Sequence, residues 1–137
     1  MPLENLNVQF REYISNQSGI SIVKETDSYI NFSSNGLIFV FEIFENDPYY
    51  FRIILPNIFA IDNSNESWVN TQIENFLINI KVARLVKKDL SVSAIADSFV
   101  YSPKNIDYLF NRVLSCLVTV YDEFKKNYFD EYGSQNQ

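Results

Sequence analysis

The chain has 137 residues, 47% of them hydrophobic, with 11 Lys and Arg against 17 Asp and Glu, which gives a net charge of −6. This length and composition indicate one folded domain spanning residues 1–137 and exclude a disordered chain. The acidic balance argues against nonspecific binding to nucleic acid or to an anionic membrane.

The chemistry open to this chain is narrow, because it contains no histidine and one cysteine, Cys116. The lack of histidine excludes Ser-His-Asp and Cys-His catalysis and imidazole metal sites. With a single cysteine, the chain can form neither an internal disulfide nor a thiolate cluster. We therefore expect no metal and no cofactor. The N-terminal residues have no basic and apolar signal-peptide pattern, and no apolar run approaches the ~20 residues of a membrane span, so we expect a cytoplasmic protein.

Residues 3–17 are predicted to form a helix, which Ser18-Gly19 ends. Its apolar residues recur at spacings of three and four, as on one face of a helix. They are Leu3, Leu6, Phe10, Tyr13 and Ile14.

Two β-rich runs follow, residues 20–25 and 28–33, and their register stays open. Asn35-Gly36 is the strongest signal in the chain, because both residues tolerate the positive φ of a type I′ hairpin turn. A two-residue turn there pairs Ser34 with Leu37, and therefore sets Phe32 opposite Phe39 and Ile30 opposite Phe41.

Residues 37–45 and 49–55 read as the next hairpin, joined by a three-residue loop at 46–48 that sets Glu45 opposite Tyr49. This register places Glu42 across from Arg52, a favourable pair of opposite charges. With the two earlier runs, these strands make a four-stranded antiparallel meander.

Strand alternation divides the meander into two faces. The core face holds Ile30, Phe32, Phe39, Phe41, Ile43, Phe51, Ile53 and Leu55. The other face is mixed rather than polar, and its apolar residues would form one patch if no helix of the chain covered them. We name five of them as candidate protein-interaction residues: Ile38, Val40, Phe44, Tyr50 and Ile54.

Pro56 is expected to end the fourth strand, because it cannot donate to a sheet ladder. Residues 57–61 are either a connection or a short strand. A second helix is predicted at 66–79, where Trp68 lies off the apolar stripe, at its edge or partly exposed. The stripe consists of Val69, Ile73, Phe76, Leu77 and Ile80.

Residues 81–87 and 90–100 are predicted to form two more strands, joined at Lys88-Asp89. Ala94 and Ala96, on an apolar face with Leu90 and Val92, suggest that a helix backbone approaches closely. Positive charge also gathers here, as solvated edge charges or as a docking site for an acidic partner. The basic residues are Lys81, Arg84, Lys87 and Lys88.

Ser102-Pro103 is a sharp helix start, with Ser as N-cap and Pro at the first helical position. The helix is expected to run from Pro103 to about Phe129, and the polar tail 130–137 to fray. Its apolar arc is broader than one sheet face needs, so the helix is either clasped between the sheet and another helix or meets a second subunit. The main stripe consists of Ile106, Phe110, Val113, Leu117, Val120 or Tyr121, Phe124 and Tyr128.

The predicted fold class is α+β, a four-strand meander plus a later two-strand hairpin packed by three helices, in the order α-β-β-β-β-α-β-β-α. This order resembles the type III secretion chaperone-like fold, and in particular its YbjN-type branch of sensory transduction regulators. Three segments carry the resemblance: residues 76–84 at the end of the second helix, the strand at 90–94, and the Ser102-Pro103 helix start.

The resemblance implies a small, non-enzymatic domain, often dimeric, that binds another polypeptide. No functional residue is carried over, because this chain has four strands before its second helix. The resulting hypothesis is a protein-binding, chaperone-like or regulatory domain, associating through an apolar sheet or helix surface as a homodimer. The alternative is a small-ligand-binding protein or minor enzyme with a pocket between sheet and helices that uses Glu42, Arg52 and tyrosine hydroxyls.

Overall fold

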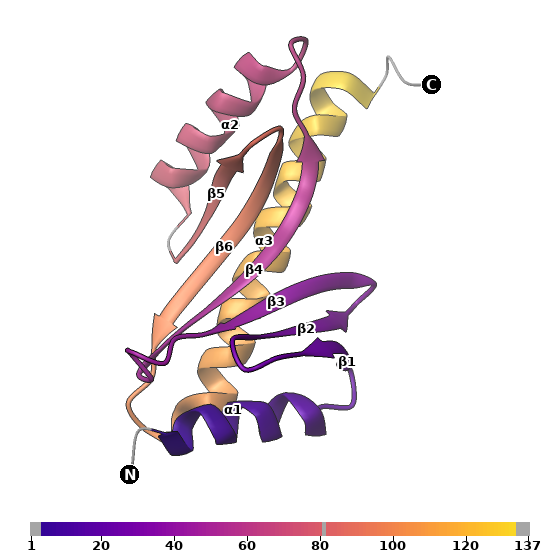
Figure 1. Ribbon diagram of the computed structural model, residues 1–137. Coiled ribbons are helices and arrows are strands. Elements are labelled where there is room, and N and C mark those ends of the chain that lie inside the picture. Colours follow the sequence, from indigo (N-terminus) through magenta and orange to yellow (C-terminus); the bar gives the residue numbers. More distant parts are fainter. Residues whose placement is uncertain (1–3, 81, 134–137) are drawn as a thin grey trace.

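The computed structural model describes residues 4–80 and 82–133, which form one antiparallel sheet with helices packed on a single face (Figure 1). The strands lie in the order β1-β2-β3-β4-β6-β5. The elements are α1 (Glu4–Asn16), β1 (Ser21–Glu25), β2 (Tyr29–Ser34), β3 (Leu37–Ile43), β4 (Tyr50–Ala60), α2 (Glu66–Asn79), β5 (Ala83–Lys88), β6 (Ser91–Phe99), the 3₁₀ turn η1 (Pro103–Asn105) and α3 (Ile106–Tyr132).

The predicted fold class and element order are confirmed, and most predicted bounds agree to within two residues. Leu3, counted in the first helical stripe, and Lys81, counted in the basic group, lie outside the described residues. Of the tail expected to fray, residues 130–132 continue α3, and residues 134–137 lie outside the described part.

The hairpin registers are also confirmed. Asn35 and Gly36 have φ of 54° and 79°, as a type I′ turn requires, and Ser34 pairs with Leu37. Phe32 lies opposite Phe39 in the same ladder. The partners Ile30–Phe41 and Glu42–Arg52 are also as predicted.

The connection between β3 and β4 is longer than the predicted three-residue loop. The ladder ends with Ile43 opposite Phe51, so the expected pairing of Glu45 with Tyr49 is wrong. The backbone makes two successive tight turns there instead, in which the N–H of Asp47 donates to Phe44 (3.1 Å) and that of Tyr50 donates to Asp47 (3.1 Å).

The prediction that Pro56 ends the fourth strand is wrong, because β4 continues to Ala60. The β4–β6 ladder is irregular between Leu55 and Phe59, so the missing N–H of Pro56 falls where regular pairing is suspended. Asn57 adopts a φ of 55° within this bulge and accepts a hydrogen bond from Ser91 Oγ (2.9 Å).

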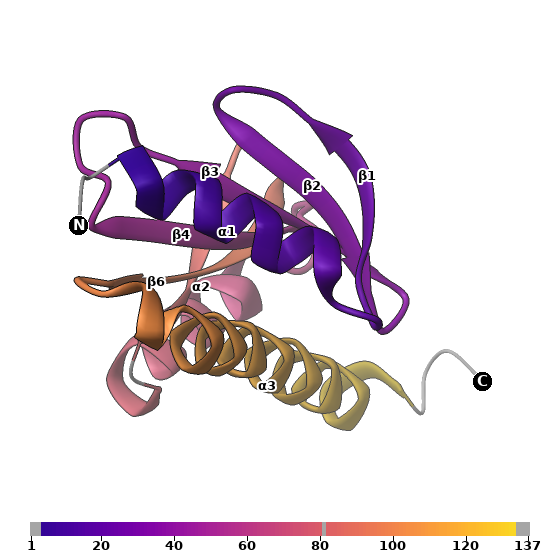
Figure 2. The same cartoon turned by 90° about the horizontal axis from the view of Figure 1, so that it is seen from below.

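All three helices pack on the core face of the sheet. In Figure 1, α3 passes behind the strands, and Figure 2 shows α3 beneath β4 and β6, with α1 crossing in front of β3 and β4. Phe10 of α1 packs between Phe41 and Phe51, with ring centroids 5.0 and 4.9 Å away. Phe110 of α3 meets Phe32 at 5.7 Å, so one aromatic cluster joins both helices to the sheet.

The second helix contacts α3 and β5. Trp68 is half-buried and packs edge-on against Phe124 of α3, at 5.3 Å between ring centroids. Leu77, predicted in the buried stripe, is 66% exposed, whereas Gln72 is buried and accepts a hydrogen bond from Asn127 Nδ2 (2.8 Å). The prediction for Leu77 is wrong because this side chain faces away from the contacts of α2 with α3, β5 and β4, the last made by Trp68 against Phe59 (5.7 Å).

The alanines of β6 lie under α3, as predicted: Ala94 and Ala96 are fully buried. Leu90, assigned to the same face, is instead in the β5–β6 turn and 73% exposed. Ser102 caps the 3₁₀ turn before α3, accepting from the N–H of Lys104 (3.3 Å). Contacts of α3 with the sheet, α1 and α2 account for the breadth of its apolar arc, which is the first of the two alternatives raised above.

Candidate functional site: the uncovered sheet face

No helix among the described residues covers the second face of the sheet. Along β4, Phe51, Ile53 and Leu55 are at most 3% exposed on the helical side, whereas Arg52 and Ile54 between them are only half-buried. The same alternation continues through β2, β3, β5 and β6. We call this surface the uncovered face.

The five predicted interaction residues all lie on the uncovered face or at its border, but in two groups. Val40 pairs directly with Ile54, and Ile38, two residues before Val40 on β3, is 46% exposed. Phe44 and Tyr50 meet at the other end of these strands, with ring centroids 5.1 Å apart. A charged pair, Glu42 and Arg52, separates the groups, so the single apolar patch expected from sequence is divided.

The apolar group on β3 and β4 extends onto strands that the sequence reading did not include. Ile95 of β6 lies opposite Ile54 and opposite Arg84 of β5. A depression of about 450 Å³ opens here, at the level of the β4 bulge. Its lining is Val40, Ile54, Pro56, Asn57, Val86, Lys88, Asp89, Ser91, Ser93 and Ile95.

The divider between the two apolar groups is a hydrogen-bonded network centred on Asp97 of β6. Asp97 Oδ2 accepts from Tyr50 Oη (2.5 Å) and Arg84 Nη2 (3.1 Å), and lies 3.7 Å from Arg52 Nε. Arg52 Nη1 in turn lies 3.7 Å from Glu42 Oε1. The guanidinium of Arg52 also lies 5.8 Å from the centroid of the Tyr50 ring, a cation–π distance.

These contacts shift the pKa values of Asp97, Tyr50 and Arg52. Burial alone would raise the pKa of Asp97, but hydrogen bonds from Tyr50 and Arg84, with the charges of Arg84 and Arg52, outweigh it and lower the pKa. Burial and the hydrogen bond to Asp97 raise the pKa of Tyr50. Burial opposes ionisation of Arg52, but Tyr50, Glu42 and Asp97 together raise its pKa. At neutral pH the network is thus a set of paired, fixed charges.

The alternative reading, a pocket between sheet and helices that uses Glu42, Arg52 and tyrosine hydroxyls, is not the arrangement found. Arg52 alternates with the buried Phe51 and Ile53, so it and its partners Glu42 and Tyr50 lie on the side away from the helices. Sequence reasoning missed Asp97 as their partner, because β6 pairs with β4 only after the long excursion through α2 and β5.

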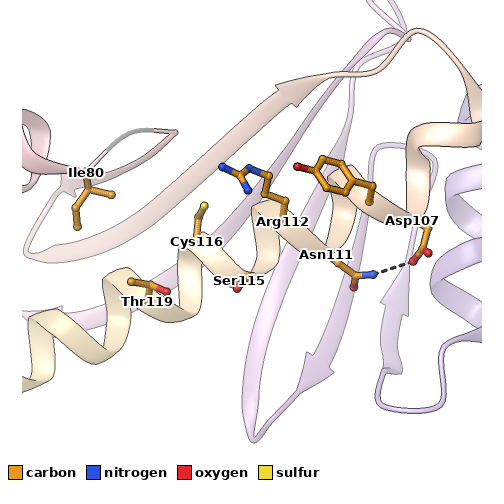
Figure 3. A pocket seen from close by; sticks show the side chains of 8 residues that line it. Ile80, Asp107, Asn111, Arg112, Ser115, Cys116 and Thr119 are labelled. Atoms are coloured by element: carbon orange, nitrogen blue, oxygen red, sulfur yellow. Dashed lines mark hydrogen bonds between the residues drawn. The ribbon is translucent and has the colours of Figure 1, made fainter.

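A second hollow lies on the outer side of α3, near the end of α2 (Figure 3). It measures about 600 Å³ and is lined mainly by one face of α3, including Tyr108, Arg112 and the half-buried Cys116. Its carboxylate, Asp107, is occupied by hydrogen bonds from Asn111 Nδ2 (2.8 Å) and Tyr13 Oη (2.6 Å). The hollow therefore brings together no free acid–base pair.

The basic residues singled out from sequence do not act as one cluster. Arg84 belongs to the Asp97 network, whereas Lys87 points to the helical side and donates to Asn70 of α2 (3.1 Å). Lys88 borders the depression. Across residues 4–80 and 82–133 no group of three or more acidic or Cys side chains is placed to hold a metal ion, and no helix there has the length and hydrophobicity to cross a membrane.

Comparison with known proteins identifies the fold. No protein-family model and no curated protein sequence matches the chain. Among solved structures, YbjN from E. coli, a proposed transcription regulator, superposes with a TM-score of 0.63 over 93% of each chain, at 9% sequence identity. The chain has the YbjN fold. At this identity the YbjN likeness concerns the backbone arrangement, so the roles of individual side chains are argued from this chain alone.

Proposed function

We propose that this YbjN-fold chain is a non-enzymatic protein-binding or regulatory domain that engages its partner with the uncovered face. The supporting observation is the group of apolar side chains on that face, Ile38, Val40, Ile54 and Ile95, which no helix of the described chain covers. Apolar patches of this kind on an otherwise acidic surface are typical of docking sites.

The network beside the patch suits recognition more than catalysis. Asp97, Arg52 and Arg84 are already paired with one another, so each charge is held in place before a partner arrives. Fixed charges around an apolar centre set the orientation and selectivity of docking. Together with the YbjN fold, this pattern supports a role in binding. We also propose a cytoplasmic location, as expected from the sequence.

We further propose that one partner is a second copy of the chain. The uncovered face carries both signs of charge within a few ångströms of each other, Glu42 and Asp97 beside Arg52 and Arg84. A face that carries both signs of charge can be complementary to itself across a two-fold axis, as an isologous dimer requires.

The test introduces charge at the centre of the apolar group. Val40→Glu combined with Ile54→Glu places two carboxylates at directly paired positions of β3 and β4. We expect dimerisation, measured by size-exclusion chromatography with light scattering, to weaken at least a hundredfold. The circular dichroism spectrum should stay that of the wild type, because both side chains are only half-buried.

A matched control is available on α2, where Leu77 and Ile78 are 66% and 79% exposed. Changing both to Glu adds the same charge away from the uncovered face and should leave association unchanged. Equal association of the wild type and the Val40/Ile54 variant would refute the docking role of this face.

A further inference from the structure

Five aromatic rings form a continuous row at the end of the sheet where β4 begins and β6 ends. Phe44, Tyr50, Phe99, Tyr101 and Tyr49 follow one another with ring centroids 5.1, 5.4, 6.3 and 5.2 Å apart. Figure 1 shows the β3–β4 turn beside the end of β6. We call these residues the aromatic row.

The fold exposes two members of the row, Phe99 and Tyr101, whereas Phe44, Tyr49 and Tyr50 are half-buried. Val100 is 1% exposed and faces the core, and its N–H donates to the carbonyl of Tyr49 (2.6 Å). Its neighbours point the other way: Phe99, the last residue of β6, and Tyr101, just after the strand, are 55% and 68% exposed. Phe99 also lies directly opposite Tyr50 in the ladder.

The border of the row is acidic. Glu45 and Asp47 are exposed in the β3–β4 turn, and neither takes part in an ion pair among the described residues. Arg52, whose guanidinium lies 5.4 Å from the centroid of the Phe44 ring, is already paired with Glu42 and Asp97. A partner of this row is thus favoured if it carries positive charge, and the phosphates of a nucleic acid are repelled.

The ring geometry limits further the class of partner that fits the aromatic row. Successive rings are mostly tilted, with interplanar angles of 57°, 53°, 9° and 43°, so the row does not present a flat platform for stacking bases. Two ring spacings of 5.1 and 5.4 Å amount to about 10 Å along a straight row. A polyproline II segment repeats its side chains every three residues, roughly 9 Å.

We propose that the aromatic row binds a proline-rich segment in the polyproline II conformation that also carries Arg or Lys. The proline rings pack against the tilted aromatic rings, and the Arg or Lys side chain forms ion pairs with the carboxylates of Glu45 and Asp47. Aromatic-lined surfaces bind such segments because the peptide is already ordered and loses little entropy on docking. This inference rests on the proposed function in that both require a polypeptide partner.

The test uses a synthetic peptide of four Pro-Pro-Arg repeats, titrated into the ¹⁵N-labelled chain and followed by NMR. We expect backbone shifts concentrated at residues 44–50 and 97–101. Replacing the Arg by Glu should abolish binding, because the carboxylates repel it. Replacing both prolines by Ala should weaken binding at least tenfold, because the peptide loses its preformed conformation.

Variants of the chain complete the test. Phe99→Ala with Tyr101→Ala should weaken binding at least tenfold, and Tyr101→Ala alone, outside any strand, should weaken it severalfold with the fold intact. The Val40/Ile54 double Glu variant should still bind the peptide. The Val40/Ile54 variant tests association through the uncovered face, whereas the peptide titration tests the aromatic row. Each proposal can therefore fail without the other.

Three outcomes would overturn the inference. They are absence of shifts at millimolar peptide, equal binding of the alanine-substituted peptide, and tighter binding of a single-stranded oligonucleotide than of the Pro-Pro-Arg peptide.

Discussion

The carboxylate of Asp97 links three neighbouring strands through side-chain contacts. It stands on β6 and pairs with Tyr50 and Arg52 of β4 and with Arg84 of β5. Sequence patterning put Glu42 and Arg52 together correctly, because a hairpin register relates them. It did not find Asp97, because nothing local connects residue 97 with residue 52.

Replacing Asp97 with Asn should destabilise the fold by about 1–2 kcal/mol at neutral pH, a modest value because the side chain is 22% exposed. The folded pKa of Asp97 lies below its ordinary value, so its stabilisation is present above about pH 4 and is lost as the pH falls through the folded pKa. The free energy of unfolding of the wild type, measured with urea, should therefore fall more steeply below about pH 4 than that of the variant.

A control for this prediction is Asp122→Asn, at an exposed position on α3, which should shift the unfolding midpoint little. Identical acid profiles of the wild type and the Asp97 variant would contradict the assignment of Asp97 as the centre of the network.

Tyr13 fastens α1 to the start of α3. Burial, and then the hydrogen bond that its hydroxyl donates to Asp107, raise the pKa of Tyr13 to about 12. Because the folded pKa is raised, the stabilisation is complete below about pH 10 and is lost as the pH rises towards 12. Tyr13→Phe should lose about 0.5–1 kcal/mol near neutral pH and show a shallower alkaline decline, measured by urea unfolding from pH 8 to 12. A decline equally steep in both proteins would argue against this role.

Among the helices and strands, side-chain burial follows the sequence pattern where the element pairs along its length with a neighbour. Burial along β2 to β4 and β6 alternates as their patterns predicted, whereas Leu77 of α2 is exposed because it faces away from the contacts of that helix with α3, β4 and β5. The strand end predicted at Pro56 was wrong because the bulge interrupts regular pairing there, so no backbone N–H is needed at this position. Element identity was thus more predictable than element ends.

The alanines of β6 test how closely α3 approaches. Ala94→Leu should destabilise the fold by about 1–3 kcal/mol, because the site is fully buried beneath the helix and has no room for the larger side chain. Ile95→Leu, the neighbouring position on the uncovered face, is the matched control and should cost less than about 1 kcal/mol. Chemical denaturation measures both, and equal effects would show that α3 is not in close contact there.

At the scale of the molecule, the three helices share one sheet face and one aromatic core. The single domain predicted for residues 1–137 should therefore unfold in one step. Trp68 fluorescence, which reports on the α2–α3 contact, and far-ultraviolet circular dichroism should give the same urea midpoint. Separate midpoints would show that the β1–β3 part and the α2–β5 part are independent units.

The helices, most of the strand positions, the Asn35-Gly36 turn and the pairing within hairpins could be predicted from the amino-acid sequence, because these depend on residues that are close along the chain. The apolar face of each strand could also be predicted, since alternation is a local property. The position of β6 between β4 and β5, and the packing of every helix on the same side, emerge only in the folded chain. These features depend on contacts among residues tens of positions apart, whose cost and gain are set by the packing of the whole core. The uncovered face, the Asp97 network and the aromatic row all arise from them.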